Sequence, residues 1–315
     1  MRPKILITPR ALSRDGHPAL NLLQDAGYDL LFCTPGQTPS EDELLCLVPQ
    51  CVGWLAGVEP VSDRVIAAAN TLRAISRNGT GVDNLPMHII KEKKIFVLRA
   101  EGSNARGVAE LAVAMLLCAM RRILPTNDGL KAGGWPRLIG REVENRTVAL
   151  IGYGHIGTEF AKMACGLGAK VRAYDPFVMH PFRPIGDFTW YRNLNLLDDA
   201  DVVSLHAPGQ ASGQALLGAD ELSLLTRGAI VINTARASLV DDAAMLSALE
   251  SGLVGMYATD VFDTEPPVMS ELLRHPQVIT TSHIGGYTEE SVARATTAAV
   301  ENLMRVLGRA DALAA

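Results

Sequence analysis

Cysteine is scarce in this sequence, and no two cysteines have the C-x-x-C spacing of redox motifs and zinc ribbons. The five that occur in 315 residues are odd in number, so they cannot form a complete disulfide framework. Long apolar runs are missing too. The longest, residues 108–120, contains Glu110 and is shorter than the ~18 residues that suggest a membrane span. The start of the chain lacks the apolar stretch of a signal peptide. We therefore expect a cytoplasmic protein with reduced thiols and no membrane partner.

An excess of basic residues is also absent. The chain has 29 Lys and Arg against 34 Asp and Glu, a formal net charge of −5, and no long basic run. This balance argues against nucleic acid as a partner. Hydrophobic residues make up 48% and charged residues 20% of the sequence, which is close to soluble globular averages and excludes a disordered or fibrous chain. The length predicts about two domains, and a small molecule is the expected partner.

Short apolar runs alternate with helix-length amphipathic segments, which predicts an α/β fold with two doubly wound parallel sheets. The strands expected in the first sheet are 4–8, 28–33, 51–56, 72–76 and 95–98. Those expected in the second are 148–151, 170–174, 201–206, 229–233, 255–259 and 278–281. Residues 103–123 and 289–307 are predicted to form two long connecting helices, the second of which returns to the first domain.

A glycine pattern marks a dinucleotide site. Gly152, Gly154 and Gly157 directly follow the strand 148–151 and open a helix. In that context the first glycine permits a tight turn, the second lets the backbone approach a pyrophosphate, and the third allows close helix–strand packing. The next strand ends in Asp175, where an acid can hold the ribose hydroxyls and repel a 2′-phosphate. The pattern therefore predicts NAD rather than NADP.

Polar residues follow three later strands. Arg236, Asp260 and His283 are expected at one sheet edge, because the carboxyl ends of neighbouring parallel strands lie together. Glu265 precedes two prolines, which favour an extended segment. An arginine, a carboxylate and a histidine near a nicotinamide suit exchange between a 2-hydroxy acid and a 2-keto acid. Arg236 would bind the substrate carboxylate, His283 would transfer the proton, and Glu265 would orient the imidazole.

The segments 233–241, 260–267 and 283–288, together with 77–84 and 152–157, resemble the D-isomer-specific 2-hydroxyacid dehydrogenases, and most closely their phosphoglycerate dehydrogenase branch. The resemblance implies a Rossmann NAD-binding domain, residues 100–284, inserted in a flavodoxin-like substrate domain, residues 1–99 and 285–315. It also implies a homodimer. Asn78, Gly79, Arg236 and His283 are then the expected substrate contacts. The expected cofactor contacts are Thr80, Gly152, Gly154, His155, Ile156, Gly157, Asp175, His206, Pro208, Thr234, Ala235, Arg236, Asp260, His283, Gly285 and Gly286.

Several alternatives stay open. Hydroxypyruvate or glyoxylate could replace phosphoglycerate as substrate, and Arg77 and Arg99 are the candidates for binding a phosphate. The same fold resembles NAD-sensing corepressors, which keep the catalytic residues. The chain ends at Ala315, so no C-terminal regulatory domain and no serine feedback are expected. No spacing of histidines, cysteines and acids predicts a metal site.

Overall fold

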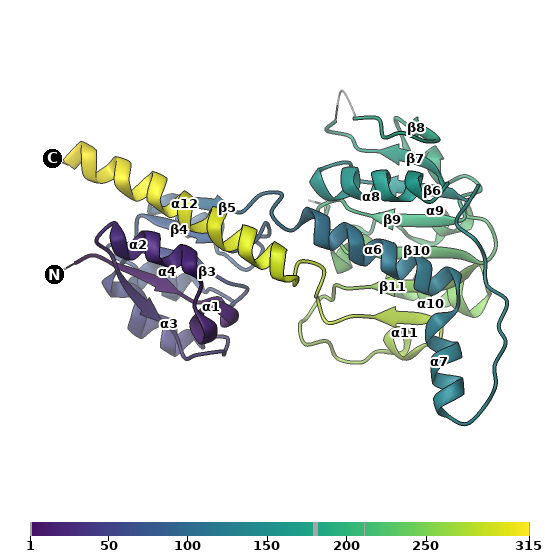
Figure 1. Ribbon diagram of the computed structural model, residues 1–315, viewed down its shortest axis with the longest axis horizontal. Coiled ribbons are helices and arrows are strands. Elements are labelled where there is room, and N and C mark those ends of the chain that lie inside the picture. The colour runs from purple at the N-terminus through teal and green to yellow at the C-terminus, as the bar shows by residue number, and fades with distance from the viewer. Residues whose placement is uncertain (1, 179–181, 211, 315) are drawn as a thin grey trace. The chain divides into compact units, whose positions relative to one another are not determined.

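The computed structural model describes residues 2–178, 182–210 and 212–314. The chain forms two compact units, Met1–Asn104 with Thr288–Ala315, and Ala105–Tyr287. Each unit contains one parallel sheet with helices on both faces (Figure 1). The predicted α/β class is therefore confirmed.

The first unit has a five-stranded sheet in the order β2-β1-β3-β4-β5, the order of flavodoxin-like folds. Its strands are β1 (Lys4–Ile7), β2 (Asp29–Phe32), β3 (Cys51–Ala56), β4 (Ala74–Arg77) and β5 (Phe96–Arg99). All neighbouring pairs are parallel. Each strand overlaps the range predicted for it.

Helices cover both faces of this sheet. They are α1 (Arg10–Asp15), α2 (Asn21–Asp25), α3 (Glu41–Leu47), α4 (Asp63–Ala68), α5 (Met87–Glu92) and α12 (Glu289–Ala314). Side chains of α3, α4 and α5 form one apolar core with the sheet, and those of α1, α2 and α12 form the other. In α12, Val300, Leu303 and Leu307 are fully buried. The last helix therefore returns to the first sheet, as predicted, because its apolar face completes that core.

The second unit has a seven-stranded parallel sheet in the order β12-β11-β10-β9-β6-β7-β8. Its strands are β6 (Thr147–Ile151), β7 (Lys170–Tyr174), β8 (Phe188–Trp190), β9 (Val202–Leu205), β10 (Ala229–Asn233), β11 (Val254–Thr259) and β12 (Val278–Thr280). Six of them were predicted. The sequence prediction missed β8, which has only three residues and none of them buried, so its pattern carries no strand signal.

The helices of this unit are α6 (Ala105–Met120), α7 (Ile123–Lys131), α8 (His155–Gly166), α9 (Ala219–Ser223), α10 (Asp242–Glu250) and α11 (Glu271–Arg274). In Figure 1, α6 and α8 lie over one face of the sheet. The prediction of one connecting helix over 103–123 was wrong in two respects. The helix ends at Met120, because Arg122 adopts a left-handed backbone with φ of 54°. Also, α6 packs on α8 and β10, so it forms a layer of this unit.

Among the described residues, no helix combines the length and the apolar character needed to cross a lipid bilayer. The same residues contain no group of three or more histidine, cysteine, aspartate or glutamate side chains arranged to hold a metal ion.

Candidate active site

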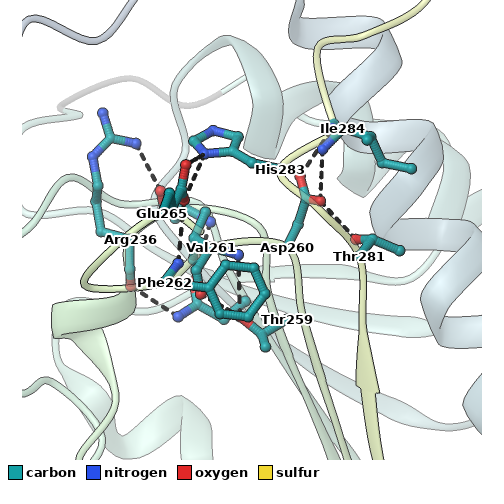
Figure 2. A network of polar contacts seen from close by, with 12 residues as sticks. Arg236, Thr259, Asp260, Val261, Phe262, Glu265, Thr281, His283 and Ile284 are labelled. Carbon is teal, nitrogen blue, oxygen red and sulfur yellow. Dashed lines mark hydrogen bonds and ion pairs between the residues drawn. The ribbon is translucent and has the colours of Figure 1, made fainter. Parts of the chain in front are cut away.

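Three neighbouring strands of the second unit supply the predicted reacting groups. Strands β10, β11 and β12 are adjacent and parallel, so their carboxyl ends share one edge. Arg236 follows β10, Glu265 follows β11, and His283 follows β12. Figure 2 shows the Arg236 side chain beside the Glu265–His283 pair. The sheet topology therefore brings together three residues that are up to 47 positions apart in the sequence.

His283 and Glu265 form a close pair. The His283 Nδ1 lies 2.8 Å from both Glu265 Oε1 and Oε2. Because an ionised carboxylate only accepts hydrogen bonds, Nδ1 carries the hydrogen and Nε2 is left to take up and release a proton. The side chains are 48% and 39% exposed, respectively, so the pair is accessible from solvent. This is the arrangement of a general acid–base with an orienting carboxylate.

The backbone of His283 is strained, since its φ is 54°, in the left-handed region that non-glycine residues rarely adopt. Asp260 holds the chain on either side of it. Its carboxylate accepts hydrogen bonds from Thr281 Oγ1 at 2.6 Å, Ile284 N at 2.8 Å and Gly285 N at 2.8 Å. Three bonds to one carboxylate therefore offset the strain and fix the position of the imidazole.

Asp260 was predicted to face the cofactor together with Arg236 and His283. In the structure its side chain is only 1% exposed and its carboxylate is directed at residues 281–285, as Figure 2 shows for Thr281 and Ile284. Asp260 thus stabilises the backbone conformation of residues 281–285, which carry His283. Contact between Asp260 and a cofactor stays a prediction.

Arg236 lies on a short turn whose backbone is held by Asn233, the last residue of β10. Asn233 Nδ2 donates to Arg236 O at 2.8 Å, and Asn233 Oδ1 accepts from Ala235 N at 3.1 Å. The Arg236 Nη1 donates to Ala235 O at 2.7 Å. Asn233 is absent from the predicted site residues. A polar residue ending a fully apolar strand was the signal that could have identified it.

The glycine loop after β6 has the shape that a dinucleotide needs. A Cβ on Gly152, whose φ is 92°, would lie 2.5 Å from the His206 carbonyl carbon, and one on Gly157 would lie 2.0 Å from Gly152 O. These two glycines therefore permit close packing within the protein. A Cβ on Gly154 would meet no atom within 4 Å, so this glycine faces open space at the start of α8. His155 and Ile156 form the first turn of that helix, where backbone N–H groups favour anions.

Asp175 lies beside this loop at the end of β7. Its Oδ2 accepts from Tyr153 N, and its Oδ1 accepts from Phe177 N, both at 2.8 Å. The carboxylate is thereby fixed next to the glycine turn, with lone pairs left for ribose hydroxyls. Its negative charge disfavours a 2′-phosphate at the same place.

Two buried polar atoms at the neighbouring strand ends lack partners among the described residues: His206 Nδ1 after β9 and Thr234 Oγ1 after β10. The other ring nitrogen of His206 is 2.9 Å from Ser204 Oγ. Burial lowers the pKa of His206 to about 3, so the ring is neutral near pH 7. The order of the strands reverses between β6 and β9, which is where doubly wound sheets bind their ligands. A polar group bound there would give these two atoms hydrogen-bond partners. The residues therefore fit a dinucleotide cofactor.

The remaining predicted contacts lie on loops. In the second unit Pro208 is exposed, whereas Ala235 and Gly285 are buried, and Gly286 is half-buried. In the first unit Asn78, Gly79 and Thr80 directly follow β4. Asn78 N donates to Ala56 O at 2.9 Å, and Asn78 Oδ1 accepts from Thr296 Oγ1 at 3.5 Å. The assignment of these residues to substrate and cofactor stays a prediction.

Comparison with known proteins identifies the family. Residues 113–285 match the family model described as the D-isomer specific 2-hydroxyacid dehydrogenase, NAD binding domain. The chain is 35% identical to the hydroxypyruvate reductase of Thermotoga maritima, over 85% of this chain and 89% of that protein. It is 34% identical to the D-3-phosphoglycerate dehydrogenase of Methanocaldococcus jannaschii, over 78% of this chain but 48% of that protein. The chain thus spans about half the length of this phosphoglycerate dehydrogenase.

A solved structure shows the same fold. The crystal structure of the TT0316 protein from Thermus thermophilus has a TM-score of 0.84 and 31% identity, over 97% of both chains. The matched domain binds NAD, as the glycine pattern predicted. The chain therefore belongs to the D-isomer-specific 2-hydroxyacid dehydrogenases, a family of NAD-dependent oxidoreductases.

Proposed function

We propose that this chain interconverts a small D-2-hydroxy acid and its 2-keto acid, with Arg236, Glu265 and His283 as the catalytic residues. The observation that carries the proposal is the contact of His283 Nδ1 with both Glu265 carboxylate oxygens at 2.8 Å. It leaves Nε2 as the one ring nitrogen able to exchange a proton with a substrate. NAD, bound along the glycine loop and Asp175, supplies the hydride chemistry.

In the direction of reduction, the carbonyl carbon gains a hydride and the carbonyl oxygen gains the proton from His283 Nε2. In oxidation, the same nitrogen takes the hydroxyl proton as the hydride leaves the carbon. The Glu265 carboxylate stabilises the imidazolium form and prevents the ring from turning. His206 does not serve this purpose, because its neutral ring has a pKa of about 3.

Arg236 is proposed to bind the substrate carboxylate and to polarise the adjacent carbonyl. A guanidinium presents parallel N–H groups that match a carboxylate, and it stays charged at any working pH. Asn78 and Gly79 of the first unit are proposed as additional substrate contacts, so the first unit would serve the substrate and the second the cofactor.

We further propose that the substrate carries no phosphate. Arg77, one of the two predicted phosphate ligands, is only 5% exposed. Its Nε donates to Gly81 O at 2.7 Å and its Nη1 donates to Ala56 O at 3.0 Å. These donors hold the loop after β4 in place, whereas Arg99, the other predicted ligand, is exposed at the end of β5. With one of the two predicted phosphate ligands bonded to backbone oxygens, an acid such as hydroxypyruvate is favoured over 3-phosphoglycerate.

A substrate panel tests this proposal. We expect NADH consumption, followed at 340 nm, with hydroxypyruvate or glyoxylate. The kcat/KM with 3-phosphohydroxypyruvate should be at least about tenfold lower than with these two acids, since each lost polar contact costs about 1–2 kcal/mol. A preference for the phosphorylated acid would contradict the substrate assignment alone. Absence of turnover with every 2-keto acid, together with NADH-dependent capture of a protein partner, would favour a corepressor-like function.

We propose that the protein acts as a homodimer in the cytoplasm. Helix α7 buries no residue, and the segment after it exposes Trp135 (79%) and Ile139 (94%). Figure 1 shows α7 and this segment extending from the body of the unit. A second copy would cover this apolar surface. All five cysteines are free thiols, which suits a reducing compartment.

Light scattering should therefore give twice the chain mass of 33.7 kDa. We expect Trp135→Asp to yield a folded monomer, because a buried charge at the interface is costly. Phe96→Asp is the matched control, since Phe96 is also exposed and apolar but lies on β5 of the first unit. A monomeric native chain, or dissociation by the control as well, would contradict this proposal.

A further inference from the structure

Asn233 connects the segments that carry the reacting groups. It is fully buried at the carboxyl end of β10. Its side chain bonds to Ala235 N and to Arg236 O, as described above. Its own carbonyl oxygen accepts from Asp260 N at 3.0 Å. One residue therefore touches both the turn that leads to Arg236 and the segment that leads to Glu265.

The hydrogen bonds of Asn233 require an amide and no other side chain. The oxygen must accept from Ala235 N, and the nitrogen must donate to Arg236 O. An aspartate of the same size would place a charged oxygen against the Arg236 carbonyl, and two acceptors repel each other. The Asn233 side chain is fully buried, so a charged carboxylate at this position would also lose hydration.

The Arg236 carbonyl oxygen accepts a second hydrogen bond, from Leu239 N at 3.2 Å, so the Asn233 amide and the following turn together hold it. The φ and ψ of Arg236, −145° and 138°, are extended, and the 3₁₀ turn Ala237–Leu239 begins directly after it. The Asn233 amide thus closes a loop of four residues around an extended residue. The direction in which the Arg236 guanidinium leaves the backbone depends on this closure.

We infer that Asn233 is the positioning residue for Arg236 in substrate binding. It sets the angle of the guanidinium, which a two-point contact with a carboxylate requires. Asn233 does not itself touch the substrate. This inference rests on the proposed role of Arg236, and it adds a residue that acts only through that arginine.

The test measures binding of oxalate, a 2-keto acid mimic, to the NADH-loaded protein by calorimetry. We expect Asn233→Asp to weaken oxalate binding about 10- to 100-fold, since a displacement of about 1 Å can cost 10²-fold. In an Arg236→Ala background the same substitution should change binding less than about twofold, because residues that act through one another are not additive. The pH profile of kcat, which depends on His283, should keep its shape.

Asn302→Asp is the matched control. Asn302 Nδ2 also donates to a backbone oxygen, that of Arg99, at 3.0 Å, but it lies on α12 of the first unit. Asn233→Ser, which keeps a side-chain oxygen and removes the amide nitrogen, serves if the aspartate variant does not fold. Unchanged oxalate binding in Arg236→Ala would overturn the proposed function. Weaker binding in Arg236→Ala with normal binding in the Asn233 variants, or equal losses in both backgrounds, would overturn this inference alone.

Discussion

The His283→Ala variant should lose turnover by roughly 10²- to 10⁴-fold, the range typical of a lost general acid–base. The substitution removes the imidazole whose Nε2 is proposed to exchange the proton, while Asp260 still accepts hydrogen bonds from the Thr281 hydroxyl before it and from Ile284 N and Gly285 N after it. NADH affinity, measured by fluorescence titration, should change little, because the glycine loop and Asp175 lie at other strand ends. The expected result is thus an enzyme that binds its cofactor and does not use it.

His88→Ala is the control for this experiment. His88 Nε2 lies 3.0 Å from Asp63 Oδ2, so it also forms a histidine–carboxylate pair, but on the surface of the first unit. We expect this variant to keep the native kcat. If His283→Ala kept more than about a tenth of the native kcat, another group would have to transfer the proton, since a general acid–base contributes at least about 10²-fold.

Alanine at Gly152 and at Gly154 should have separable effects. Gly152→Ala combines a left-handed backbone with a Cβ 2.5 Å from the His206 carbonyl carbon, so we expect a stability loss of about 3 kcal/mol. That corresponds to a fall in Tm of roughly 6–12 °C. The Cβ added by Gly154→Ala would have no protein atom within 4 Å, so we expect the Tm of this variant to equal that of the native protein.

NADH affinity supplies the second measurement for this pair. We expect Gly154→Ala to weaken NADH binding at least about tenfold, because the added methyl occupies the space through which the backbone approaches a pyrophosphate. Thermal unfolding without cofactor, and fluorescence titration with it, distinguish the two glycines. Full NADH affinity in Gly154→Ala would place the pyrophosphate elsewhere.

Much of the fold was predictable from residue patterns. Apolar runs bounded by turn residues predict eleven of the twelve strands found in the described part of the chain, and the apolar pattern of residues 289–307 predicts the return of α12 to the first sheet. Strand β8 escaped because three residues, none buried, carry no periodic signal. The end of the helix before Arg122 was not predicted, because arginine favours helices and only the tertiary structure shows its left-handed backbone.

The sequence by itself determined which candidate groups follow each strand: the glycine spacing, the acid after the second strand, and the arginine, glutamate and histidine after three others. Residue type and order suffice for that, because a local pattern specifies which groups follow each strand. Only the tertiary structure decided how these groups are supported. Asp260 accepts hydrogen bonds from the backbone that follows His283, and Asn233 donates to the carbonyl of Arg236. Arg77 donates to a backbone carbonyl of the loop after β4. Such roles depend on which strands become neighbours and on which donors are buried, and no local pattern records either.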